Sequence, residues 1–163
     1  MRVLQIGAGR WGRNHVRCWK RLGVELAVCD TDAAALADLD VPTSAHRREL
    51  LDAADAVDVA TPAGSHAALV REALEAGKDV FVEKPFAPEA AEAFDLDAVA
   101  RERGAILQVG HVFRFSPVAR ALAAALAQGR IGRPRCATGH FTGFKRPRTD
   151  GGGYRLGTDR GAL

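Results

Sequence analysis

A glycine-rich turn close to the amino terminus limits this chain to very few folds. An apolar run over residues 3–6 is typical of a parallel strand that is covered on both faces. Gly7, Gly9 and Gly12 follow it in the spacing G-x-G-x-x-G. The first glycine allows a tight turn, the second lets the backbone approach a pyrophosphate, and the third lets the next helix pack on the strand. This order predicts a strand, a phosphate-binding turn and a helix whose start faces the phosphates.

The residues after the turn extend this interpretation. A helix is expected over residues 13–22, where Gly23 ends it, and a second strand over residues 24–29. Asp30 ends that strand, and a carboxylate there is placed to accept hydrogen bonds from the adenine ribose hydroxyls. It would repel a 2′-phosphate, as would Asp32, and no Arg or Lys lies between Asp30 and Arg47. The sequence therefore favours NAD over NADP as the cofactor.

Strand and helix patterns alternate through the next eighty residues. Helical segments are expected over 31–39, 44–54, 66–76 and 88–103, and a short strand or turn over 41–43. Strands are expected over 56–60 and 79–82, and over 105–110 with continuation into 111–115. Such alternation predicts an α/β fold, a Rossmann-type doubly wound parallel sheet, over residues 1–116. In such a sheet ligands lie outside the carboxyl ends of the strands, which is where the polar residues of this chain fall.

The pattern changes from residue 117 onward. A helix is expected over 117–128 and a strand over 135–141, and the remainder is rich in Gly, Arg and Pro. We interpret 117–163 as a linker helix and the incomplete beginning of a second α/β domain. Because this helix and strand lack a domain to pack against, and an unpaired strand edge favours association, we expect a homo-oligomer.

Composition excludes several functional classes. The net charge of +3 and the pI near 9.0 come from dispersed arginines, which is typical of a solvated surface and not of a nucleic-acid site. The three cysteines form no C-x-x-C pair, so neither a disulfide framework nor a metal site is expected. They fit a reducing cytoplasm, where we expect the protein. No apolar run approaches the length of a membrane span, so no membrane association is expected.

Four motifs in this order resemble those of the glucose–fructose oxidoreductase and inositol dehydrogenase family of NAD(P)-dependent oxidoreductases (Gfo/Idh/MocA). The motifs are Gly7-Ala8-Gly9-Arg10-Trp11-Gly12, Ala60-Thr61-Pro62 with His66, Glu83-Lys84-Pro85, and Val109-Gly110-His111-Val112-Phe113-Arg114-Phe115-Ser116-Pro117. The resemblance covers about the first 117 residues. It implies a Rossmann domain followed by an α/β substrate domain, with a sugar, cyclitol or related substrate between them.

The resemblance also assigns roles to residues. It implies that Lys84 is catalytic, because it reaches the nicotinamide ribose and the reacting oxygen of the substrate, where a lysine can stabilise developing charge. It implies further contacts to the cofactor beyond the glycines and Asp30, from Arg10, Trp11, Thr61, Pro62, His66, Glu83, Lys84 and Arg114.

Local alternatives to these roles stay open. Lys84 would otherwise make a surface ion pair with Glu83 or another carboxylate, and His66 would satisfy backbone groups near it. Trp11 would pack beside the turn, and Arg114 would be a solvated charge. We expect His111 and His140 to be structural or solvated.

The chain departs from the family pattern at its end. Members carry an aspartate–histidine motif in the second domain as the acid–base partner, and no histidine follows Asp150 here. We therefore expect a truncated oxidoreductase that is incomplete for catalysis, and one hypothesis is a reading frame that ends early. The alternative is a non-catalytic dinucleotide-binding module, or a subunit completed by another chain. A third class, the S-adenosylmethionine-dependent methyltransferases, shares the glycine turn but gives Glu83-Lys84-Pro85 no role.

Overall fold

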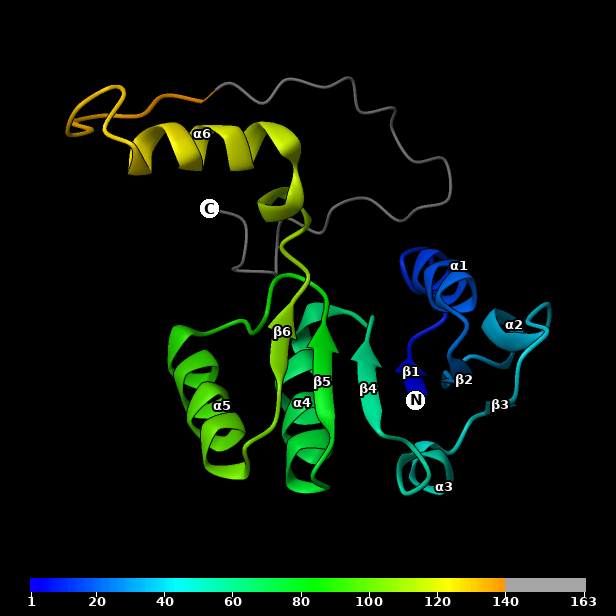
Figure 1. Ribbon diagram of the computed structural model, residues 1–163. Coiled ribbons are helices and arrows are strands. Elements are labelled where there is room, and N and C mark those ends of the chain that lie inside the picture. The colour runs from blue at the N-terminus through cyan, green and yellow to red at the C-terminus, as the bar shows by residue number, and fades with distance from the viewer. Residues whose placement is uncertain (140–163) are drawn as a thin grey trace. The chain divides into compact units, whose positions relative to one another are not determined.

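The computed structural model describes residues 1–139 (Figure 1). Residues 1–110 form one compact unit, and residue 111 begins a second. The first unit contains every strand of the described chain.

The first unit is built on a six-stranded parallel sheet. Its strand order is β3-β2-β1-β4-β5-β6, and every neighbouring pair is parallel. The strands are β1 (Arg2–Ile6), β2 (Glu25–Cys29), β3 (Thr43–Ser44), β4 (Ala56–Val59), β5 (Asp79–Val82) and β6 (Leu107–Val109). This is the doubly wound order of a Rossmann fold, so the predicted fold class is confirmed.

Helices connect the strands as the alternation predicted. They are α1 (Gly12–Leu22), α2 (Ala33–Leu36), α3 (Arg47–Leu51), the short 3₁₀ helix η1 (Ala63–Ser65), α4 (His66–Glu75) and α5 (Ala90–Arg103). The helices α2 and α3 are much shorter than expected. The short strand or turn expected over 41–43 is the strand β3, which pairs with β2 and takes up Ser44, the residue at which the predicted helix began.

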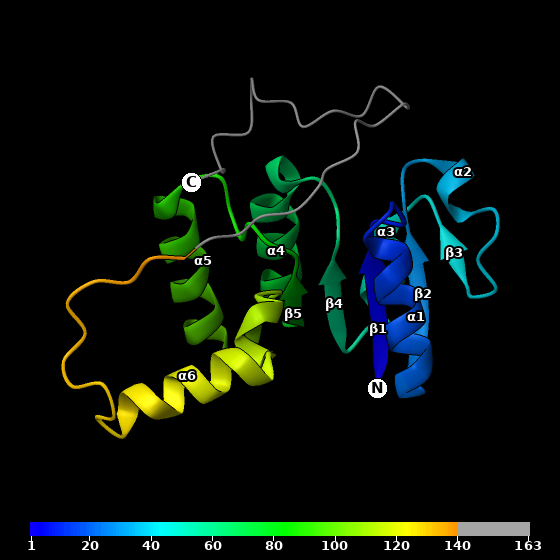
Figure 2. The same ribbon diagram turned by 90° about the horizontal axis from the view of Figure 1, so that it is seen from above.

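Two apolar clusters cover the two faces of the sheet. Residues 4 and 6 of β1 face a large cluster that includes side chains from α3, α4 and α5. Val3 faces a smaller cluster with Val16 of α1 and Leu36 of α2. Neighbouring residues of β1 face different clusters because successive side chains of a strand point to opposite faces of the sheet. Figure 2 shows α1 and α4 on opposite sides of the strands.

The second unit begins with a 3₁₀ helix, η2 (Val112–Phe115), and continues with α6 (Pro117–Ala127). The expected continuation of the last strand into residues 111–115 is therefore wrong: β6 ends at Val109, and a 3₁₀ turn follows. The strand expected over 135–141 is absent from its described part, residues 135–139, and residues 140–141 lie outside the described chain. Among residues 1–139 nothing pairs with that segment as a neighbouring strand.

None of the helices in residues 1–139 combines the length and apolar character needed to cross a bilayer. Within the same range, no group of three or more His, Cys, Asp or Glu side chains is arranged to hold a metal ion.

Candidate functional site

The polar residues that the sequence singled out gather at the carboxyl ends of the central strands. The glycine turn follows β1, Asp30 follows β2, Thr61 comes shortly after β4, and Glu83 follows β5. Since β1, β2, β4 and β5 are parallel neighbours, these residues share one edge of the sheet. Only Arg114 among the predicted site residues belongs to the second unit, where it lies in η2.

The glycine turn is closed against its own backbone at two positions and open at the third. Gly7 has a φ of +103°, and a Cβ there would lie 2.5 Å from the carbonyl oxygen of Ala60. A Cβ at Gly12 would lie 2.1 Å from the carbonyl oxygen of Gly7, so α1 begins against the turn. A Cβ at Gly9 would meet no atom within 4 Å. The chain itself therefore requires Gly7 and Gly12, whereas Gly9 leaves room beside the turn for another molecule.

A buried glutamine holds the turn in this shape. The side chain of Gln5 is fully buried, and its Nε2 donates hydrogen bonds to the carbonyl oxygens of Gly7 at 2.8 Å and Gly12 at 2.9 Å. Both amide hydrogens are thus used to join the end of β1 to the start of α1. Its Oε1 is buried without a hydrogen-bond partner among the described residues.

Asp30 links the glycine turn to the end of β2. Its Oδ2 accepts a hydrogen bond from the backbone N–H of Ala8 at 2.7 Å, and its Oδ1 accepts one from the N–H of Asp32 at 2.9 Å. Each carboxylate oxygen has more than one acceptor site, so both can still accept a hydrogen bond from a ligand hydroxyl. The carboxylate therefore fixes the turn and also stays available at its edge.

The segment after β4 is held by a chain of hydroxyl and imidazole contacts. Ser65 Oγ donates to the carbonyl oxygen of Pro62 at 2.8 Å, so the 2.7 Å contact between Ser65 Oγ and Thr61 Oγ1 has Thr61 as its donor. His66 is buried, and its ring nitrogens lie 2.9 Å from the carbonyl oxygen of Thr61 and 2.7 Å from that of Pro85. His66 therefore connects the turn after β4 to the turn after β5.

Glu83 and Lys84 lie at the carboxyl end of β5. Glu83 Oε2 accepts a hydrogen bond from the backbone N–H of Lys84 at 3.0 Å, and the peptide bond between Lys84 and Pro85 is cis. The Lys84 side chain is exposed. Among residues 1–139, no carboxylate lies within ion-pair distance of its ammonium group, so the alternative pairing with Glu83 is not formed.

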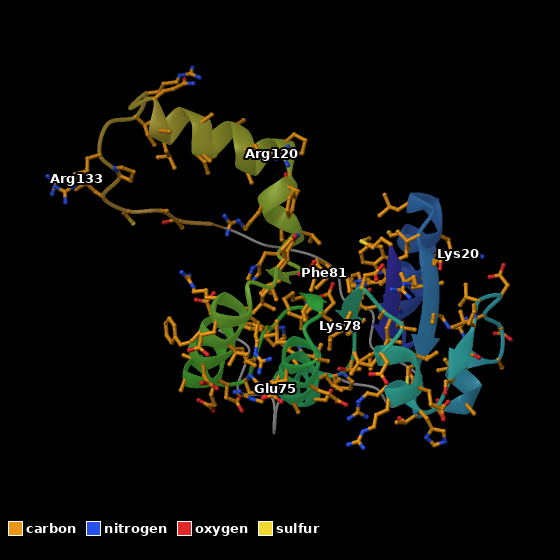
Figure 3. All side chains as sticks on the ribbon, turned by 60° about the horizontal axis from the view of Figure 1, so that its bottom comes forward. Lys20, Glu75, Lys78, Phe81, Arg120 and Arg133 are labelled. Atoms are coloured by element: carbon orange, nitrogen blue, oxygen red, sulfur yellow. The ribbon has the colours of Figure 1, made fainter. Side chains whose placement is uncertain are left out.

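A cluster of charged and polar side chains lies under this edge of the sheet. His15 Nδ1 is 2.9 Å from Oδ2 of Asp58, and His15 Nε2 is 3.2 Å from Oε1 of Glu83. Trp19 Nε1 donates to Asp58 Oδ2 at 2.6 Å. The ring of Phe81, labelled on β5 in Figure 3, packs at a tilt against the imidazole, with ring centroids 5.7 Å apart.

The pKa of His15 is raised in this environment. Burial by itself lowers the pKa, but the hydrogen bonds and negative charges of Asp58 and Glu83 together outweigh it. The Asp58 side chain is 0% exposed and that of His15 is 13% exposed, so solvent screens this cluster weakly.

The remaining predicted contacts of the glycine turn lie at its surface. Arg10 and Trp11 are exposed, and the Trp11 carbonyl oxygen accepts hydrogen bonds from the N–H groups of Asn14 and His15 at the start of α1.

A hollow of about 180 Å³ lies away from this turn, at the amino ends of β1 and β2, and its charged residues are Arg2 and Glu25. Neither the glycines nor Lys84 line this hollow. The residues predicted to bind a cofactor lie at the opposite, carboxyl ends of the strands, which we therefore take as the candidate site.

Four residues of this site were not predicted from the sequence: Gln5, His15, Trp19 and Asp58. Two of these carried a readable signal, since Gln5 and Asp58 interrupt apolar strands that are buried on both faces. A polar side chain in such a place needs a buried partner. The partners of Asp58 come from α1, which the sequence pattern alone did not place against it.

Comparisons with known proteins agree with this geometry. Residues 1–111 match the Gfo/Idh/MocA model, described as "Oxidoreductase family, NAD-binding Rossmann fold". D-apiose dehydrogenase of Paraburkholderia graminis is 36% identical over 138 residues, which are 79% of this chain and 37% of that protein. Inositol 2-dehydrogenase 2 of Paenarthrobacter aurescens is 38% identical over 144 residues, which are 80% of this chain and 43% of that protein.

A solved structure extends the comparison to three dimensions. The WlbA dehydrogenase of Chromobacterium violaceum, in complex with NADH and UDP-GlcNAcA, matches with a TM-score of 0.76 and 29% identity. The match covers 82% of this chain and 41% of that one. The chain thus spans about two fifths of the length of these relatives.

Substitution of Gly12 by alanine should destabilise the fold, whereas the same change at Gly9 should not. The new methyl group at residue 12 would overlap the carbonyl oxygen of Gly7, which we expect to lower the free energy of unfolding by about 1–3 kcal/mol. Gly9→Ala meets open space and should stay within about 0.5 kcal/mol of the wild type. Urea unfolding followed by circular dichroism measures both, and equal losses would contradict the described turn.

The His15 cluster should make stability depend on pH. Because the folded state raises the pKa of His15, its contribution is complete below the unfolded value of about 6.5 and is lost as the pH rises through the raised value. Near pH 6, His15→Gln should lower the free energy of unfolding by about 1–3 kcal/mol, and the difference should shrink toward pH 9. His46→Gln, at an exposed histidine, is the control. A difference independent of pH would contradict the charged state of the ring.

Proposed function

Because the chain belongs to the Gfo/Idh/MocA oxidoreductase family, with its NAD-binding Rossmann fold over residues 1–111, we propose that the protein takes part in NAD-dependent hydride transfer on a sugar or cyclitol. The observation that carries the proposal is the glycine turn. Gly7 and Gly12 close it against the backbone, while Gly9 leaves open space beside the start of α1. Backbone N–H groups at a helix start bind phosphate well, so the residues present fit a bound pyrophosphate.

The charges around Asp30 support NAD over NADP. Asp30 and Asp32 lie together at the end of β2, and a 2′-phosphate near them would meet two carboxylates. Arg13 reaches the same region from α1, but it donates to the carbonyl oxygen of Ala35 and lies 3.7 Å from Asp38. Its charge is therefore already engaged by the chain.

Lys84 is the residue we assign to the reaction. Bound NAD would supply the hydride acceptor at this edge of the sheet. An exposed ammonium that has no ion-pair partner among the described residues can donate a hydrogen bond to a substrate oxygen and stabilise charge that develops on it. His66 contacts the carbonyl oxygen of Pro85, the residue after Lys84, and that of Thr61. It therefore joins the turn that carries Lys84 to the turn that contains Thr61 and Pro62. We propose that the turn of Thr61 and Pro62 borders the cofactor, together with Arg10 and Trp11.

The substrate class rests on the relatives. D-apiose dehydrogenase and inositol 2-dehydrogenase 2 are named for a sugar and a cyclitol, and the WlbA structure holds a nucleotide sugar derivative. We therefore propose a polyhydroxylated ring or sugar as substrate, whose hydroxyl is oxidised or whose carbonyl is reduced. The three free cysteines, of which Cys18 and Cys136 are exposed, are consistent with a reducing cytoplasm, where we place the protein.

NAD binding tests this proposal directly. In calorimetric titration the chain should bind NAD at least tenfold more tightly than NADP, because of the two carboxylates. Gly9→Ala should abolish binding without loss of stability, since its methyl group occupies the space proposed for the pyrophosphate. Gly139→Ala adds the same methyl group in open space elsewhere and should bind normally. Asp30→Asn should narrow the preference for NAD.

Two results would overturn the proposal. One is the absence of binding of either dinucleotide by the folded wild-type chain. The other is equal binding of NAD by the wild type and Gly9→Ala, since the turn would then not be the phosphate site.

We also propose that the protein is a homo-oligomer. Val118 and Leu122 lie four residues apart on one face of α6, and they are 78% and 57% exposed. Exposed apolar groups of this kind favour association. Light scattering should give at least twice the chain mass of 17.3 kDa, and the double variant Val118→Asp with Leu122→Asp should give a monomer. A wild type that stays monomeric at high concentration would contradict this.

A further inference from the structure

We propose that His15 is a positioning residue that joins the phosphate-binding start of α1 to the turn that carries Lys84. The proposal rests on the proposed function, because its readout is the binding of NAD. It assigns His15 a role that acts through Glu83, and not through contact with the cofactor.

A row of three side chains lies beneath α1. Gln5, Asp58 and Phe81 are register partners across β1, β4 and β5, so they point to the same face of the sheet. Gln5 binds the start of α1 at Gly12, and Asp58 and Phe81 contact His15 one turn further along that helix. The helix is therefore attached to three neighbouring strands through a single row.

The two contacts of the His15 ring require a positively charged imidazole. Both ring nitrogens face carboxylate oxygens, Nδ1 toward Asp58 and Nε2 toward Glu83. An ionised carboxylate only accepts hydrogen bonds, so both contacts are satisfied only when both nitrogens carry hydrogen. The imidazolium thus joins β4 to the end of β5 by two charge-assisted hydrogen bonds.

The contact with His15 orients the carboxylate of Glu83. With Oε1 held by His15, the carboxylate presents Oε2 to the backbone N–H of Lys84. Its surroundings are tight, because a Cβ added at Gly110 would lie 3.3 Å from Oε1. The path from α1 to the lysine is therefore short: imidazole, carboxylate, then the amide of Lys84.

A purely structural role explains this cluster less well. Buried ion pairs contribute little more net stability than apolar side chains of similar size would, since desolvation offsets their attraction, although removal of one partner alone is costly. What they do provide is a fixed geometry at a defined place. Here that place is the junction between α1, whose start faces the proposed pyrophosphate, and the residue proposed to act on the substrate.

The test compares NAD with ADP, which lacks the nicotinamide riboside. His15→Gln should weaken NAD binding about tenfold, the loss of one charge-assisted hydrogen bond, and should change ADP binding less than twofold. ADP is spared because Gln5 and Asp30 hold the glycine turn without His15. Lys84→Ala should weaken NAD binding in the wild type but have little further effect in His15→Gln, because the lysine is already misplaced there.

A spectroscopic readout accompanies the binding data. The amide resonance of Lys84 should shift in His15→Gln, because its hydrogen bond to Glu83 loosens, while the Asp32 amide should stay in place. His46→Gln is the matched control and should behave as wild type in every measurement.

The outcomes separate this inference from the proposed function. Equal weakening of NAD and ADP, additive effects of the two substitutions or an unmoved Lys84 amide would overturn the role of His15 while NAD binding stands. A wild-type chain that binds neither NAD nor ADP would overturn the proposed function and this inference with it.

Discussion

The parallel pairing of β1 with β2 on one side and β4 on the other is the constraint on which the site depends. The chain leaves β1 toward the face covered by α1, and it leaves β4 toward the face covered by α4. Two connections that depart in opposite directions leave the strand ends between them uncovered by either helix, which is where ligands bind in open α/β sheets. Gly7 must be a glycine at this point because its turn passes against the carbonyl oxygen of Ala60.

Buried polar groups then fix the edge that the topology creates. Gln5 and Asp58 are both fully buried in strands that otherwise present apolar side chains, and each is bound to α1 or the turn before it. Leaving such groups unpaired would cost about 1–3 kcal/mol each, so helix and strands are held in one relative position. Asp30 and His66 do the same for the turns after β2 and β4. The result is a set of backbone turns held in place before any ligand arrives.

The sequence predicted the framework well because that framework follows from local patterns. The boundaries of β5, the stop of α1 at Gly23 and the roles of Gly7 and Gly12 were readable from apolar runs and glycine spacing. The contacts of His15 were not, because they join residues 43 and 68 positions apart, and no local pattern encodes such a distance. The start of α3 was placed too early for a similar reason, since β3 pairs with β2 and takes Ser44 from the helical pattern.

A map of amide chemical shifts on addition of NAD to the assigned chain tests directly whether the dinucleotide binds at the carboxyl ends of the strands. We expect shifts in the glycine turn, at Asp30 and Asp32, at Thr61 and at Lys84, all at the carboxyl ends of the strands. We expect unchanged resonances at Arg2, the first residue of β1, and at Lys78, which directly precedes β5 and is labelled in Figure 3. Shifts centred on the amino ends, or scattered over both ends alike, would contradict this expectation.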